Sequence, residues 1–156
     1  MQGRLTTTSF LRWPTGGLGP WLVGLLLVLP WVLPWAPGPS ANTVPLLVSW
    51  GTLAALLVVA RLPSPLELAR AWAWAALISS VIGLLQYFGE TAALGGWMHP
   101  STLGNAIGNL RQRNQLATLM CMGAVAVLWW HSQGLGRKHA LWMLALLAIG
   151  SAATSS

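Results

Sequence analysis

The sequence predicts an all-α membrane protein, a polytopic transmembrane helical bundle of about five spans with a cytoplasmic N-terminus. Of its 156 residues, 55% are hydrophobic and only 6% are charged. Soluble domains carry about 25% charged residues, so no soluble core would bury this much apolar sequence. A membrane β-barrel would alternate apolar and polar residues, and the apolar run 22–29 shows no such alternation.

Five segments approach the length of about 20 mainly apolar residues that a spanning helix needs. We expect these spans near 18–36, 44–60, 71–88, 115–131 and 140–154. Arg4 and Arg12 precede the first segment, as in a signal peptide, but the apolar stretch is long for one and no convincing cleavage site follows it. We therefore expect an uncleaved anchor, which Pro30 and Pro34 would kink or end in its outer half.

The distribution of Lys and Arg predicts the orientation, because cytoplasmic loops carry most of the positive charge. With residues 1–17 in the cytoplasm, two cationic residues, Arg111 and Arg113, fall on the outer side, in the loop 89–114. Six fall on the inner side: Arg4, Arg12, Arg61, Arg70, Arg137 and Lys138. Most tryptophans then lie near a membrane interface, where indole rings favour the headgroup level, and we expect Trp50 inside the bundle.

The remaining composition excludes several classes of protein. The net charge is +6, but the cationic residues form no run, so we expect no nucleic-acid partner. Cys121 is the only cysteine, which allows no intrachain disulfide and no cysteine-based metal site, and we expect it to be a small buried hydrophobe. No spacing of metal ligands or of a cofactor motif is present, so we predict neither a metal nor a cofactor.

The fifth segment runs out at Ser155 and Ser156 with no outer loop after it. At about 1.5 Å per residue, a helix from 140 to 154 barely crosses the hydrocarbon core. We therefore expect this sequence to be the N-terminal part of a longer protein. Alternatively, the small residues from Gly150 onward would pack closely against another helix.

The loop 89–114 contains the residues that we select as a candidate binding site. Arg111 and Arg113 stand where the loop meets the fourth segment, and the arginine fork matches phosphate oxygens in a bidentate way. Asn114 is a plausible N-cap, and a helix N-terminus favours an anion. The alternative is that both arginines reach ordinary lipid headgroups.

Other polar residues of this loop have two interpretations each. Gln112, Asn114 and Gln115 would hydrogen-bond sugar hydroxyls or, equally, neighbouring helices. His99 is a candidate general base, but without an identifiable partner we favour a solvated loop histidine. Glu90 is interpreted as an interfacial carboxylate. No pairing of a nucleophile with a base is recognisable, so we predict no catalytic residue.

The segment from Gly108 to Thr118, with the sequence GNLRQRNQLAT, resembles the signature of bacterial protein glycosylation ligases. These pilin-type O-oligosaccharyltransferases are related to O-antigen ligases and polymerases, and the resemblance is specific over about 106–130. It implies a multi-pass protein of the bacterial inner membrane. Such a protein transfers glycan from an undecaprenyl-pyrophosphate carrier to Ser or Thr of a pilin-like protein in the periplasm.

The resemblance also implies roles for individual residues. Arg111 and Arg113 become candidates for holding the pyrophosphate of the carrier, with Gln112, Asn114 and Gln115 beside them. The family's catalytic histidine belongs to a large periplasmic loop C-terminal to this region, so we transfer no catalytic role to His99. We accordingly expect no activity from the 156 residues alone.

Three alternative functions remain open at this stage. An O-antigen ligase or polymerase would use the same carrier with a lipid or glycan acceptor. A transporter or flippase would read an anionic substrate with the arginine pair, although such proteins often show internal repeats and broken spans near the midplane, and none is visible here. A non-catalytic membrane subunit is the third alternative.

Overall fold

The computed structural model describes residues 19–33, 43–58 and 63–154, and within these ranges the chain is all-helical, without strands. The elements are α1 (Gly19–Val32), α2 (Thr43–Val58), α3 (Pro65–Tyr87), the short 3-10 helix η1 (Thr91–Trp97), α4 (Arg113–Ser132) and α5 (Arg137–Thr154). Each predicted segment thus overlaps one helix, and the all-α prediction is confirmed for these residues. The predictions for the N-terminus 1–17 and for Pro34 and Arg61 lie outside the described ranges.

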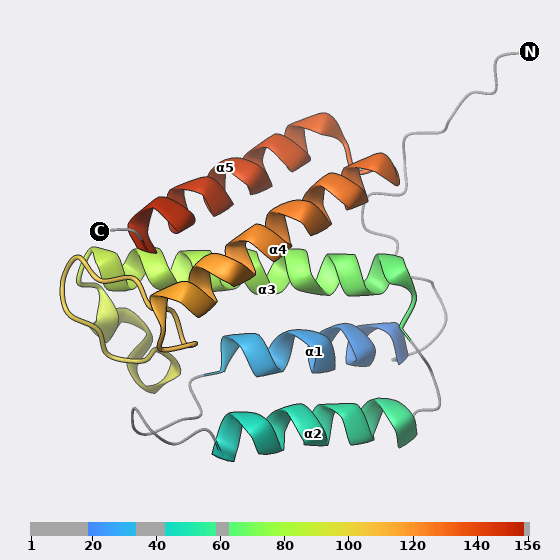
Figure 1. Ribbon diagram of the computed structural model, residues 1–156, viewed down its shortest axis with the longest axis horizontal. Helices are drawn as coiled ribbons and strands as arrows, with labels where there is room; N and C mark the ends of the chain where they lie inside the picture. Colours follow the sequence, from blue (N-terminus) through green and yellow to red (C-terminus); the bar gives the residue numbers. More distant parts are fainter. Residues whose placement is uncertain (1–18, 34–42, 59–62, 155–156) are drawn as a thin grey trace, which may run out of the picture.

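Helix α3 is the centre of the arrangement (Figure 1). It packs against α1 on one side and against α4 and α5 on the other, α4 also packs against α5, and α2 packs against α1. Successive helices run in alternating directions, so the α3–α4 loop lies at the same end as the C-termini of α1 and α5 (Figure 1). We refer to this as the loop end of the bundle.

One helix among the described residues, α3, is long and apolar enough to cross a membrane, judged by length and composition. Two shorter apolar helical stretches, Leu22–Val32 and Leu46–Val58, belong to α1 and α2. Helices α4 and α5 have 20 and 18 residues but do not reach the same level of apolarity. The prediction of about five spans is therefore not confirmed and stays a prediction.

Helix α3 begins at Pro65, well before the predicted start at 71. Ser64 is the N-cap: its Oγ accepts from the Glu67 N–H at 3.3 Å, and its own N–H donates to Glu67 Oε2 at 2.9 Å. This reciprocal capping box, followed by proline at the first helical position, is a strong start signal. The predicted segment starts after Arg70, which was counted among the cytoplasmic charges, and Glu67 precedes Arg70 in the sequence. Both belong to the helix, and the Arg70 guanidinium lies over the Trp130 ring at 5.3 Å.

Small residues allow α3 to approach α4 and α5 closely. A Cβ atom added to Gly123 of α4 would collide with the Cβ of Ala76, and one added to Gly150 of α5 would collide with the side chain of Ser80. The Ser80 hydroxyl also donates to the Leu146 carbonyl at 2.9 Å. Close contact through small residues, with a hydroxyl bonded across the interface, is typical of helix pairs in membranes.

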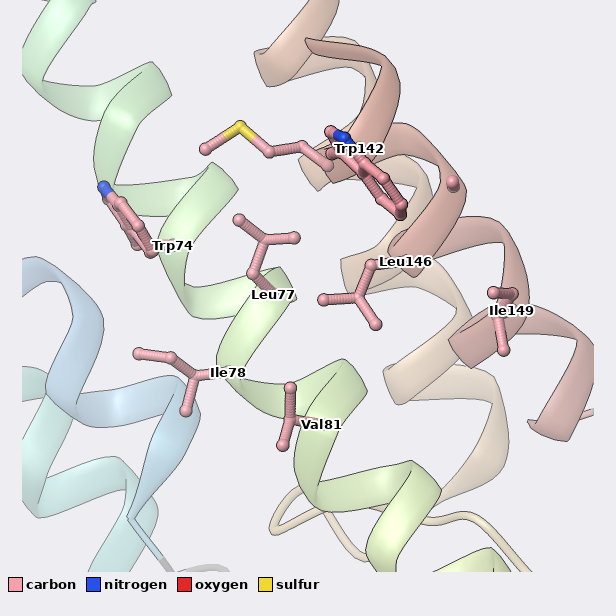
Figure 2. Close-up of a pocket in the computed structure, with 9 residues that line it drawn as sticks. Trp74, Leu77, Ile78, Val81, Trp142, Leu146 and Ile149 are labelled. Atoms are coloured by element: carbon pink, nitrogen blue, oxygen red, sulfur yellow. The ribbon is translucent and has the colours of Figure 1, made fainter. Parts of the chain in front are cut away.

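Beside this contact, side chains of α3 and α5 line an apolar groove of about 470 Å³. Figure 2 shows Leu77 of α3 and Leu146 of α5 in this groove, with Trp142 near one end. Its lining contains no ionisable side chain. The groove therefore suits hydrocarbon and supplies no group for chemistry.

Two expectations about single side chains were wrong. Cys121 is exposed instead of buried, because α4 buries another set of positions: Leu116, Leu119, Met120, Gly123, Ala126, Val127 and Trp130. Trp50 is 62% exposed instead of packed inside the bundle. It belongs to α2, which lies at the edge and packs against α1.

The close approach of the helices predicts a difference between glycines. Gly123→Ala and Gly150→Ala should each destabilise the fold by about 1–3 kcal/mol, because the added methyl group overpacks the interface. Gly51→Ala is the matched control, since a Cβ there meets nothing within 4 Å and alanine favours a helix by about 1 kcal/mol. Denaturant unfolding of the detergent-solubilised protein measures both effects. Equal stability of all three variants would contradict the interface.

Candidate functional site

The loop between α3 and α4 is tied to the end of α3 by the side chain of Gln86, which is fully buried. Its Nε2 donates to the carbonyls of His99 (2.8 Å) and Gly108 (3.3 Å). Its Oε1 accepts from the N–H groups of Ile107 (3.1 Å) and Gly108 (2.7 Å). An amide offers two donors and two acceptor lone pairs, so this side chain is fully satisfied and fixes two separate stretches of the loop.

Asn109 makes a second set of bonds to the same loop. Its Oδ1 accepts from the His99 N–H at 2.9 Å, and its Nδ2 donates to the carbonyls of Trp97 (2.9 Å) and Val32 (2.6 Å). Val32 is the last residue of α1, where carbonyls lack partners within the helix. Asn109 is 6% exposed, and it therefore joins the loop, η1 and the end of α1 in one buried network.

The start of α4 is fixed by the packing of Leu116, which is 1% exposed. A Cβ added to Gly83 of α3, or to Gly108 of the loop, would lie 3.1 Å from a Leu116 methyl group. Gly108 also has a φ of +59°, a conformation that glycine adopts at little cost. The two glycines thus leave the space in which Leu116 holds the first turn of α4 against α3.

This packing brings Arg111 and Arg113 to the junction of the loop and α4. Arg113 is the first residue of the helix, and its Nε donates to Asn105 Oδ1 at 2.7 Å. Arg111 is half-buried and has a φ of +64°, the one positive value among the described non-glycine residues. Left-handed backbone is costly for a residue with a Cβ, and such strain gathers at functional sites.

The N-cap of α4 is Gln112, with φ −139° and ψ 129°, and not Asn114 as predicted. Asn114 already lies inside the first turn, and its carbonyl accepts from the Thr118 hydroxyl at 2.8 Å. The helix begins earlier because the Leu116 N–H donates to the Gln112 carbonyl at 3.0 Å, which closes a turn ahead of Asn114. The Gln112 side chain makes no capping hydrogen bond.

All five residues selected from the sequence lie together at this junction. Gln112, Arg113, Asn114 and Gln115 are exposed, and Arg111 is half-buried. The whole sequence has two acidic residues, Glu67 and Glu90, and Glu67 lies in the first turn of α3, at the opposite end of that helix. Glu90, before η1, is the one acidic residue of the loop end. Two guanidinium groups against one carboxylate give this end a net positive charge, which favours an anion. Within the described ranges, no three His, Cys, Asp or Glu side chains group to hold a metal ion.

His99 belongs to the same cluster, which the sequence analysis did not predict. Burial lowers the pKa of its imidazole, and the positive charge of Arg111 lowers it further. His99 is a loop histidine, as predicted, but it is half-buried, and its backbone is bonded to Gln86 and Asn109. The contacts of His99 with Gln86 and Asn109 join residues 13 and 10 positions apart, so no local sequence pattern predicts them.

Comparison with known proteins identifies this same region. Residues 106–131 match the family model described as protein glycosylation ligase. The match covers Ile107, Gly108 and Asn109 of the buried network. It also covers both arginines and almost all of α4. No curated protein and no solved structure matches the chain. The chain thus contains a short region similar to protein glycosylation ligases, as the resemblance over about 106–130 implied.

The left-handed backbone at Arg111 predicts that glycine at this position stabilises the protein. Arg111→Gly should stabilise the fold by roughly 0.5–1 kcal/mol, because relief of the left-handed conformation outweighs the larger entropy of glycine in the unfolded chain. Arg113→Gly, at a helical position, should be destabilising instead. Denaturant unfolding of the two variants measures the difference. A destabilised Arg111→Gly protein would show that the backbone at 111 is unstrained.

Proposed function

We propose that the chain is the N-terminal membrane portion of an O-oligosaccharyltransferase of the bacterial inner membrane. The enzyme transfers glycan from an undecaprenyl-pyrophosphate carrier to Ser or Thr of pilin-like proteins in the periplasm. One observation carries the proposal: the glycosylation ligase match at 106–131 coincides with the junction that presents Arg111 and Arg113. In this proposal the chain is multi-pass, and the loop end faces the periplasm.

The chemistry of the transfer explains why two arginines suit this position. The acceptor hydroxyl oxygen bonds to the anomeric carbon and gives its proton to a basic group of the full enzyme or to water. The bond from that carbon to the phosphate oxygen breaks, and the carrier pyrophosphate departs with the electron pair. Negative charge therefore grows on the pyrophosphate during the reaction. Donors already aimed at developing charge lower the barrier, and a guanidinium supplies a charged fork of the right shape.

The neighbouring polar residues complete the proposed binding site. The first-turn N–H groups of α4 add the positive end of the helix dipole, which is effective within about one turn. The exposed amides of Gln112, Asn114 and Gln115 offer donors and acceptors to the sugar next to the pyrophosphate. In this proposal the arginines hold the phosphates and the amides hold the glycan.

A related ligase or polymerase of O-antigen would use the same site, and the acceptor distinguishes it. A transporter would hold its substrate near the membrane midplane. Arg113 instead begins α4, and the start of α4 lies at the loop end of the bundle (Figure 1). The position of the cationic residues therefore favours a transferase over a transporter.

The arginines are tested by substitution in the intact gene. Arg111→Ala and Arg113→Ala should each reduce glycosylation of the pilin-like acceptor by about 10- to 100-fold, the effect of losing a charged hydrogen bond. Lysine at either position should restore activity only in part, because it lacks the planar fork. Acceptor modification is measured by mass spectrometry of cells with equal amounts of inserted protein.

Arg137→Ala is the matched control, because Arg137 is exposed and starts α5 at the opposite end of the bundle. It should leave glycosylation unchanged. Full modification by the Arg111→Ala, Arg113→Ala double variant would remove the basis for the pyrophosphate site. Loss of O-antigen with normal pilin modification would identify the related ligase instead.

The proposed orientation is tested by thiol labelling. Cys121→Ser removes the one native thiol, after which Thr102→Cys places a thiol in the α3–α4 loop and Gln133→Cys places one in the α4–α5 turn. Both positions are exposed. A membrane-impermeant maleimide added to intact spheroplasts should label Thr102→Cys and not Gln133→Cys. The reverse pattern would place the arginines in the cytoplasm and contradict transfer in the periplasm.

A further inference from the structure

We propose that Gln86 is a positioning residue that holds His99 beside Arg111, and that His99 is a third group of the arginine site that contacts the bound anion. The inference rests on the proposed function, since it assumes that the arginines bind a pyrophosphate. It adds a histidine that lies outside the segment of residues 106–131 that matches the ligase model.

His99 is clamped on both sides of its peptide backbone. Its N–H donates to Asn109 Oδ1 at 2.9 Å, and its carbonyl accepts from Gln86 Nε2 at 2.8 Å. The two clamping side chains are 6% and 0% exposed. Hydrogen bonds made by buried groups are costly to lose, so the backbone that carries the imidazole is held in one orientation.

The same two side chains also fix residues 107–109, the stretch of backbone that leads to Arg111. Gln86 Oε1 accepts from the N–H groups of Ile107 and Gly108, and Asn109 is two residues before Arg111. The Arg111 N–H then points back to the Gly108 carbonyl at 3.5 Å. His99 and Arg111 are therefore positioned by shared partners, although they are twelve residues apart in the sequence.

The positive charge of Arg111 affects the protonation of the neighbouring His99. Burial first, and then the charge of Arg111, lower the pKa of His99, so the imidazole is neutral at neutral pH without a ligand. The other charged groups of the loop end are Arg113 in the first turn of α4 and Glu90 before η1. An anion at the arginines offsets the repulsion from Arg111 and raises the pKa of His99. By linkage, protonation of His99 tightens anion binding.

The sign of the pH dependence follows. His99 has two pKa values in this scheme, a higher one in the anion-bound protein and a lowered one in the free protein. Affinity for the anion should rise as the pH falls from the higher value to the lower one. At alkaline pH, where His99 is neutral in both states, the arginines alone should determine affinity. One charged hydrogen bond corresponds to about tenfold in affinity, or about 1.4 kcal/mol.

The experiment uses P1,P2-dimethyl pyrophosphate, whose two acidic groups stay ionised throughout the range from pH 5 to pH 8. Its affinity for the detergent-solubilised chain is measured by calorimetry at both ends of this range. The wild-type protein should bind about tenfold more tightly at pH 5. His99→Gln should bind equally at both pH values, with the wild-type affinity at pH 8. His139→Gln, an exposed histidine at the opposite end of the bundle, should keep the pH dependence.

The positioning role is tested by Gln86→Leu, which removes the clamp without touching the ligand. It should weaken arginine-dependent binding at pH 8, because Gln86 also holds Gly108 on the chain leading to Arg111, and it should in addition lose most of the tenfold pH dependence. Gln133→Leu is its matched control, because Gln133 is exposed at the C-cap of α4. A merely structural role for Gln86 would weaken binding equally at both pH values.

The outcomes separate the inference from the proposed function. A His99→Gln protein that keeps the pH dependence, or a wild-type affinity that does not change with pH, overturns the inference. If Arg111→Ala still abolishes binding in that case, the arginine site stands. Failure of the wild-type protein to bind the probe at either pH overturns both.

Discussion

The hydrogen bonds of the buried Gln86 amide are the constraint on which the loop end of the molecule depends. An unpaired buried amide costs about 1–3 kcal/mol for each missing partner, so loop conformations that leave Gln86 unsatisfied are disfavoured. The conformation that satisfies it brings the His99 carbonyl and the backbone at Gly108 to one side chain of α3. Arg111 and the start of α4 follow directly from the position of Gly108.

Helix packing provides the frame for that constraint. Small residues bring α4 and α5 close to α3, and Leu116 fits where Gly83 and Gly108 leave space. A frame this closely packed holds Arg111 in its left-handed conformation, which an isolated loop would relax. The cationic site is therefore a product of the packed helices as much as of the two arginines.

Hydropathy was sufficient to predict the five helices, and charge counting was sufficient to select Arg111 and Arg113. The start of α3 was missed because the analysis weighed apolar length and overlooked the Ser64–Glu67 capping box. Asn114 as N-cap, Cys121 as buried and Trp50 as packed were wrong because each depends on which helix lies next to which. The contacts of Gln86 and His99 could not be predicted, since their bonds join residues 10 to 22 positions apart and leave no local pattern. The number of membrane spans stays a prediction, with α3 as the one candidate in the described ranges.

The central claim is that the arginine pair binds the pyrophosphate of a lipid carrier. It is tested most directly by ³¹P NMR of undecaprenyl pyrophosphate in nanodiscs that contain the protein. The account predicts that the wild-type chain shifts or broadens the pyrophosphate resonances, and that the Arg111→Ala, Arg113→Ala double variant leaves them as in empty nanodiscs. Identical spectra for the wild type and the double variant would contradict it.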